Sequence, residues 1–260
     1  MTTTKAGGVA ASYLLLRKAV GWTGTLLPVV LVAGDAAFSH AALPGSLSEY
    51  YYTPMRNILV GTLCVLGVFL VAYDVGVPAD RRITNAAGAG VLGVALFPAP
   101  PAVPHVSTAQ QVVGGLHFFF AATAFLALSI TTWRFARPGS DGPGTAAPSP
   151  AAAAFYRASG ALMLCLAAAA AAANLLPAPV KAATSLIFIF EALAIITFGI
   201  SWLAKGKALQ PLQHPSRIPH RPAPRQDPGH AATPAASSTT TGPAPSAARP
   251  GHGRNIGRCR

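Results

Sequence analysis

Six apolar segments, separated by short polar loops, limit what this chain can fold into. They cover residues 18–38, 56–77, 84–100, 111–133, 154–176 and 185–204. A lipid bilayer has a hydrocarbon core of about 30 Å, which a helix of about 20 apolar residues can cross. Five segments have that length, and only 84–100 is short. The pattern predicts an all-α fold, a six-helix transmembrane bundle.

The basic residues are distributed unequally between alternate loops. If the N-terminus lies inside the cell, only Arg56 and Lys181 fall on the outer side. The other 17 of the 19 Lys and Arg residues fall inside: Lys5, Arg17, Lys18, Arg81, Arg82, Arg134, Arg137, Arg157 and all nine from Lys205 onward. Cytoplasmic loops carry an excess of Lys and Arg. The sequence therefore predicts a multi-pass protein of the cell membrane with both termini cytoplasmic.

The composition excludes a soluble globular protein. Charged residues make up 10% of the chain and hydrophobic residues 52%, too few polar groups to cover a water-exposed surface. The net charge of +12 lies in short loops and in the C-terminal tail, beside apolar segments. Anionic lipid headgroups are the natural partner of charges in such places. We expect membrane lipids as partners and no nucleic acid, and a homo-oligomer is compatible with the sequence.

The chain changes character near residue 207, which predicts two parts. Residues 1–206 form the six-span transmembrane domain, and residues 207–260 form a disordered cytoplasmic tail rich in Pro, Ala and Arg. The tail lacks a hydrophobic period, so it cannot bury a core. Its arginines predict salt-sensitive contact with anionic headgroups. Its four histidines are too widely spaced to suggest a metal site.

Smaller features predict how the helices pack and end. Gly90 and Gly93 each follow an alanine by four residues and would let another helix approach closely. The stretch 138–150 is rich in Gly, Pro, Ser and Ala and is predicted to be flexible. Trp202 and Lys205 are expected to mark the inner membrane interface.

Polar side chains gather near the outer ends of the apolar segments. His117 and Glu191 lie about two turns below the outer ends of their segments, where an unpartnered ionisable group is costly. The loop between the first two segments is the richest in polar groups. The candidate ligand-binding residues at this end are Asp35, His40, Ser48, Glu49, Tyr50, Tyr51, Tyr52, Arg56, His117 and Glu191.

These residues allow more than one interpretation. They could form a polar ligand pocket, or hydrogen bonds that only fix the bundle geometry, for instance between Glu191 and His117 or a loop tyrosine. The tyrosine triplet could be a lid over a site, or an aromatic belt at the membrane interface. Each alternative uses the same residue types, so the sequence leaves both open.

Two kinds of enzyme chemistry are alternatives to simple binding. His40, His105 and His117 with Asp35 or Glu191 would supply ligands suited to zinc. However, no H-x-x-x-H or H-E-x-x-H spacing is present, so no metal or other cofactor is predicted. A serine nucleophile at Ser46 or Ser48 is a weaker alternative, because no nucleophile-elbow pattern surrounds either residue.

Several short motifs stand out along the chain. They are the string from Ser48 to Arg56, S-E-Y-Y-Y-T-P-M-R, followed by Gly61 and Gly67 in an apolar segment, together with Asp80-Arg81-Arg82, Gly93-Val94-Ala95-Leu96-Phe97-Pro98 and Leu116-His117-Phe118. This set resembles a family of uncharacterised bacterial multi-span membrane proteins. It covers about residues 20–205 and implies a six-helix fold without an established activity. The layout is also similar to that of DRAM-like membrane proteins. Membrane hydrolases of the ceramidase type use Ser, Asp and His in a bundle, but this chain lacks their paired C-terminal histidines.

Three functional hypotheses follow. The favoured one is non-enzymatic: an outward-facing polar pocket binds a lipid headgroup or a small polar ligand, for sensing or transport. The alternatives are a membrane-embedded metal-dependent hydrolase with His and carboxylate ligands, and a structural or partner-binding membrane protein. A metal enzyme needs three or more ligands converging on one point, whereas a binding pocket needs a cavity with dispersed polar groups.

Overall fold

The structure is a computed structural model that describes residues 3–39, 43–74, 76–101, 105–141 and 145–206. The described residues all belong to one compact unit within residues 1–214. The predicted tail and His40 lie outside the described residues.

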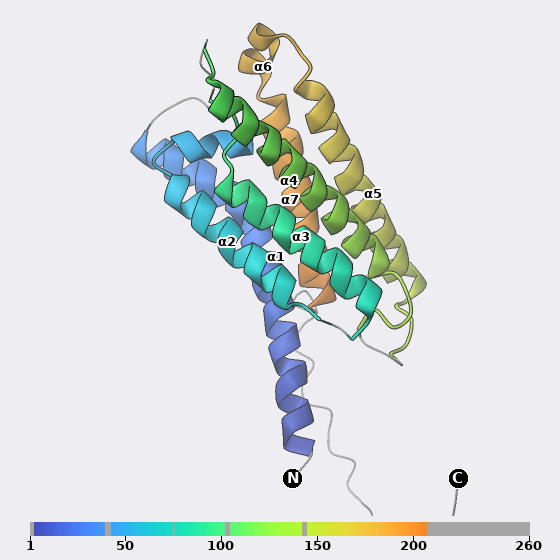
Figure 1. Cartoon of the computed structure of the whole chain (residues 1–260). Coiled ribbons are helices and arrows are strands. Elements are labelled where there is room, and N and C mark those ends of the chain that lie inside the picture. The colour runs from blue at the N-terminus through green and yellow to red at the C-terminus, as the bar shows by residue number, and fades with distance from the viewer. Residues whose placement is uncertain (1–2, 40–42, 75, 102–104, 142–144, 207–260) are drawn as a thin grey trace, which may run out of the picture. The chain divides into compact units, whose positions relative to one another are not determined.

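Every regular element of the described residues is a helix (Figure 1). The elements are α1 (Thr3–Phe38), the 3-10 helix η1 (Leu47–Tyr52), α2 (Arg56–Ala72), α3 (Pro78–Leu96), α4 (Thr108–Arg134), α5 (Pro150–Ala173), α6 (Ala178–Thr184) and α7 (Leu186–Lys205). The all-α prediction is confirmed. α1 begins well before the first predicted segment, and its 36 residues span about 54 Å.

Within the part of the chain that the structure describes, four helices are long and apolar enough to cross a membrane: Leu14–Phe38 of α1, α4, α5 and α7. α2 is apolar but has 17 residues. α3 has 19 residues and begins with the polar run Asp80-Arg81-Arg82, which lowers its mean hydropathy. Large apolar side chains such as Val29, Phe119 and Leu193 are exposed on the outside of the bundle. Such a surface is what lipid, rather than water, would cover.

The six long helices form a closed ring. Each packs against the next along the chain (α1 on α2, α2 on α3, α3 on α4, α4 on α5, α5 on α7), and α7 packs back against α1. The loops at one end of the ring include η1, and we call this the η1 end. The opposite end contains the residues around Lys205, and we call it the Lys205 end. Both ends are visible in Figure 1, where the η1 end lies uppermost.

Glycines set the closest approaches between neighbouring helices. A Cβ atom on Gly199 of α7 would lie 2.5 Å from the backbone nitrogen of Thr25 and 2.7 Å from the carbonyl oxygen of Gly21 in α1. In α3, a Cβ atom on Gly90 would lie 2.7 Å from the backbone nitrogen of Ala124. The predicted close approach at Gly90 and Gly93 therefore occurs, and both glycines face α4. Small residues let helix backbones meet in this way.

Candidate functional site

The interior of the ring holds a cavity of about 70 Å³. A single water needs about 10–15 Å³, so this cavity is several times larger. Its walls come from α1, α2, α3, α4, α7 and η1. The lining residues are Leu27, Leu47, Ser48, Tyr51, Leu59, Val60, Leu63, Leu66, Val91, Val94, Ala95, Pro98, Ala99, His117, Ala121, Ala124, Phe125, Leu128, Glu191, Ile195 and Phe198. Most are apolar, and the polar lining groups Ser48, Tyr51, His117 and Glu191 all belong to the η1 end.

Glu191 is half-buried on α7 and is bonded to the backbone of η1. Its Oε2 atom accepts a hydrogen bond of 2.8 Å from the backbone N–H of Leu47. The first N–H groups of a helix have no partner within that helix. Glu191 supplies the missing acceptor, which explains how α7 holds η1 in place. The salt bridges found among the described residues lie at the other end of the ring.

His117 is buried on α4 and joins two further segments. Its Nε2 atom lies 3.1 Å from the Oγ of Ser48, and its Nδ1 atom lies 2.7 Å from the carbonyl oxygen of Phe97. A carbonyl oxygen can only accept, so Nδ1 carries the hydrogen. In the neutral ring Nε2 then accepts, and the Ser48 hydroxyl donates to it. His117 thus links η1 to the end of α3.

The tyrosine triplet is anchored by three different contacts. Tyr50 is 1% exposed and packs against Phe188, with ring centroids 6.1 Å apart. Burial, reinforced by the negative charge of Asp35, raises the pKa of Tyr50 to about 12. The Tyr51 hydroxyl accepts a 2.6 Å hydrogen bond from Arg56, whose guanidinium also lies 4.2 Å from the centre of the Tyr51 ring.

Tyr52, Asp35 in α1 and Glu49 in η1 also make hydrogen bonds. The Tyr52 hydroxyl donates to the carbonyl oxygen of Ala99 at 2.7 Å. Asp35 accepts from the Ser39 hydroxyl at 2.8 Å, and Glu49 accepts from the backbone N–H of Gly45 at 2.9 Å. The bonds of Tyr52 and Glu49 order the loop that carries η1.

Of the ten sequence-predicted site residues, Ser48, Tyr51, His117 and Glu191 line the cavity. Asp35, Glu49, Tyr50, Tyr52 and Arg56 make the contacts described above and are not among the lining residues, and His40 lies outside the described residues. The structure gives His117 and Glu191 separate partners, which are the consecutive residues Ser48 and Leu47. The lining is largely apolar, and its polar groups lie at the η1 end.

The described residues do not form a metal centre. No group of three or more His, Cys, Asp or Glu side chains among them could hold an ion. His117 has both ring nitrogens engaged by Ser48 and Phe97, which also leaves it without a nitrogen for zinc in this geometry.

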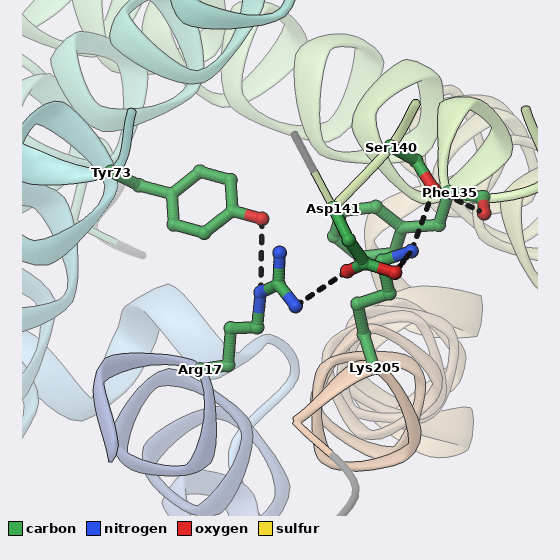
Figure 2. A network of polar contacts seen from close by, with 6 residues as sticks. All are labelled: Arg17, Tyr73, Phe135, Ser140, Asp141 and Lys205. Atoms are coloured by element: carbon green, nitrogen blue, oxygen red, sulfur yellow. Dashed lines mark hydrogen bonds and ion pairs between the residues drawn. The ribbon is translucent and has the colours of Figure 1, made fainter. Parts of the chain in front are cut away.

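A second polar cluster, not anticipated from the sequence, lies at the Lys205 end (Figure 2). Arg17 donates to Asp141 at 2.6 Å and to the Tyr73 hydroxyl at 3.1 Å. Lys205 donates to the other oxygen of Asp141 at 3.1 Å and to the Ser140 hydroxyl at 2.7 Å. Partial burial opposes ionisation, but the nearby charges of Lys205 and Arg17 outweigh it and hold the pKa of Asp141 below its ordinary value.

This cluster involves three features that the sequence singles out. The start of the stretch 138–150 is predicted to be flexible, yet Ser140 is buried and Asp141 joins α1 to α7. Trp202 and Lys205, which the sequence predicts at the inner membrane interface, are both buried between the helices of the bundle. Trp202 packs between aromatic rings, and Lys205 pairs with Asp141.

No protein-family model, curated protein or solved structure matches this chain, so the function has to be argued from the geometry alone.

Proposed function

We propose that the protein binds a slender amphiphile within the membrane, for sensing or transport of that molecule. The observation that supports this most directly is the cavity itself. It is apolar along most of its length and has Ser48, Tyr51, His117 and Glu191 gathered at one end. Ligand sites are commonly apolar with a few convergent polar groups.

The shape of the lining selects the ligand class. An apolar chain would lie among residues such as Leu63, Val91 and Leu128, and a hydroxyl, ester or amide head would meet the polar end. A wholly polar ligand would leave its own groups facing apolar walls, which is costly. The cavity volume of about 70 Å³ favours a ligand with a single apolar chain over a bulky ligand. Among the ligands expected from the sequence, a lipid with a polar head and one apolar chain is therefore favoured over a small, wholly polar molecule.

The binding site is tested with a photoactivatable monoacylglycerol bound to the full chain in phospholipid nanodiscs. Ala95 is buried and lines the cavity on α3, whereas Ala86 on the same helix is exposed outside it. Ala95→Leu should fill the cavity and lower cross-linking at least tenfold, and Ala86→Leu should leave it unchanged. Equal cross-linking in both variants, or cross-links mapped only to the outer surface, would contradict the proposal.

A six-span topology with both termini cytoplasmic is a further part of this proposal. α2 and α3 would cross with lengths of about 26 and 28 Å, slightly short of a 30 Å core. The bilayer can thin locally around short helices. A cysteine probe at Ser46 should be labelled from outside the cell, and one at Gly139 should not. The reverse pattern would show the orientation to be wrong.

The C-terminal tail is proposed to bind the membrane surface. Residues 207–260 would add salt-sensitive binding to anionic headgroups, and a homo-oligomer is compatible with the apolar outer surface. Removing residues 208–260 should weaken sedimentation with phosphatidylglycerol vesicles at low salt while leaving a folded bundle. Loss of the thermal transition in detergent after this truncation would contradict a separate tail.

We also propose, on the basis of the Ser48–Arg56 motif, that the chain belongs to the bacterial six-span family that it resembles.

A further inference from the structure

We infer that Ser48 and His117 form a nucleophile–base pair that hydrolyses an ester of the amphiphile held in the cavity. This inference rests on the proposed binding function and assigns an activity to the same site. Ser48 is a candidate site residue from the sequence, but its loop has no nucleophile-elbow pattern that would indicate a nucleophile. The pairing arises only when η1 is brought against α4.

The hydrogen-bond directions are those that a nucleophilic serine requires. The carbonyl of Phe97 fixes the hydrogen of His117 on Nδ1, at 2.7 Å. Nε2 is then left as the acceptor of the Ser48 hydroxyl proton, at 3.1 Å. A base within hydrogen-bond reach of the nucleophile, itself oriented by a third group, is the general signature of an activated serine. Here the third group is a backbone carbonyl rather than a carboxylate.

The location of the pair suits an ester with an apolar chain. Both residues line the cavity at its polar end, so a chain lying among the apolar walls would present its carbonyl carbon near Ser48. Ser48 is half-buried and His117 is buried, so the nucleophile is the more accessible of the two.

Glu191 acts here as a positioning residue. Its carboxylate holds the backbone N–H of Leu47, the residue before the nucleophile. This bond fixes the start of η1 and with it the distance between Ser48 and His117.

The reaction balances with water as the only co-reactant. The Ser48 oxygen bonds to the carbonyl carbon while its proton moves to Nε2 of His117. The bond from that carbon to the alkoxy oxygen breaks, and the alcohol leaves with the proton from Nε2. Water then gives its proton to Nε2, and its oxygen attacks the acyl carbon. The acyl–Ser48 bond breaks, Ser48 regains the proton, and a carboxylic acid is released. A backbone carbonyl orients the imidazole but adds no charge, so turnover should be slow compared with that of a Ser-His-Asp enzyme.

The test uses the full chain in nanodiscs, an alkyl fluorophosphonate and p-nitrophenyl octanoate. The fluorophosphonate should form a covalent adduct that peptide mass spectrometry locates on Ser48. Ser48→Ala should abolish the adduct and reduce p-nitrophenol release to background, and Ser46→Ala, two residues earlier in the same loop, should change neither. His117→Gln should slow adduct formation by about 10²–10⁴-fold, the usual contribution of a general base. Glu191→Gln should lower the rate less than tenfold, because the amide oxygen still accepts from Leu47.

The outcomes separate this inference from the binding proposal. If the monoacylglycerol cross-links in the cavity but wild-type Ser48 takes up no fluorophosphonate, the pair is structural and only the activity is refuted. Labelling at an undiminished rate in His117→Gln would refute the role of the base. If Ala95→Leu binds as the wild type does, the binding proposal fails. The adduct site in the wild-type chain decides the question even where a variant does not fold.

Discussion

Both ends of the ring have polar side chains near the ends of apolar helices, but these side chains have different kinds of partner at the two ends. At the Lys205 end, Arg17 and Lys205 share Asp141, and the hollow beside them measures about 10 Å³. At the η1 end, Glu191 and His117 bond to η1 and to a carbonyl, and a cavity of about 70 Å³ remains beside them. Cations are paired with a carboxylate at one end, and polar groups are satisfied by hydrogen bonds at the other.

The difference indicates which end is built for stability and which has room for a ligand. Removing one member of a buried ion pair leaves its partner uncompensated. Replacing a hydrogen-bonding carboxylate by an amide keeps an acceptor in place. The Lys205 end should therefore be the more sensitive to loss of charge, and the η1 end to loss of an acceptor.

The largest effect is expected for Asp141→Asn. The side chains of Arg17 and Lys205 are only 6% and 4% exposed, and the variant removes the negative charge that both cations share. Because Asp141 itself is 43% exposed, we expect a loss of about 3 kcal/mol in the free energy of unfolding, the low end for a broken buried pair. The measurement is denaturant unfolding in detergent micelles.

Asp74→Asn is the matched control, because Asp74 pairs at 3.4 Å with Arg81, whose side chain is 61% exposed. It should cost less than about 1 kcal/mol. In acid, the lowered folded-state pKa of Asp141 means that its contribution is present above its ordinary value of 3.8 and is lost as the pH falls through the folded-state value. Equal losses for the two variants would mean that the Lys205 end is not held by buried charge.

A smaller effect is expected at the η1 end from Glu191→Ala. The variant leaves the N–H of Leu47 without its acceptor, which costs about 1–3 kcal/mol when the group is buried. Glu191→Gln keeps an acceptor oxygen and should cost less than the alanine variant. The measurement is again the free energy of unfolding. If the glutamine variant were as unstable as the alanine variant, the η1 end would depend on charge after all, and the contrast between the ends would disappear.

The third prediction concerns Tyr50, whose pKa is raised to about 12 by burial and then by Asp35. The unfolded value is about 10, so the stability from the neutral phenol is complete below pH 10 and is lost as the pH rises from 10 to 12. Ultraviolet titration of wild type and Tyr50→Phe isolates this group. Asp35→Asn should lower the pKa of Tyr50, but not as far as the ordinary value of about 10, because Tyr50 remains buried. An unchanged titration would show that the two side chains do not interact.

The smallest effects compare helix caps at the two ends. At the η1 end, Ser107 caps α4 in a capping box with Gln110, whereas Ser149 at the Lys205 end caps α5 with one bond to the N–H of Ala152. Each Ser→Ala change should cost about 1 kcal/mol. Gln110→Ala should add a further loss of stability, because the Gln110 side chain accepts a hydrogen bond from the backbone N–H of Ser107. The cap of α5 has no such second bond. Thermal unfolding of the single and double variants checks this.

Part of this architecture could be predicted from the sequence because lipid demands long apolar runs. The six long helices follow the six apolar segments, and Glu191 and His117 stood out because ionisable groups are rare inside such runs. The boundaries were less predictable. α2 ends at Ala72 rather than near residue 77, because Asp74 and Gly76 form a turn in which Gly76 has a φ of 75°.

The parts that could not be predicted depend on contacts between distant segments. Asp141 sits in a Gly- and Pro-rich stretch that resembles a solvated linker, and only the meeting of α1 with α7 gives it two cationic partners. Ser48 and His117 are 69 residues apart, and no local pattern connects them. The short helix α6 lies in what the sequence suggested was a plain loop.

The packing of α7 against α1 has a consequence for the order in which the chain can be completed. The N-terminal helices are synthesised first. However, α1 packs through glycines against α7, the last helix of the ring, so this contact can form only after α7 has been made. Until then the inner faces of α1 and α5 have no α7 to cover them. Biogenesis of this ring therefore depends on its final segment, and a chain truncated before Leu186 should be recognised as unassembled and degraded.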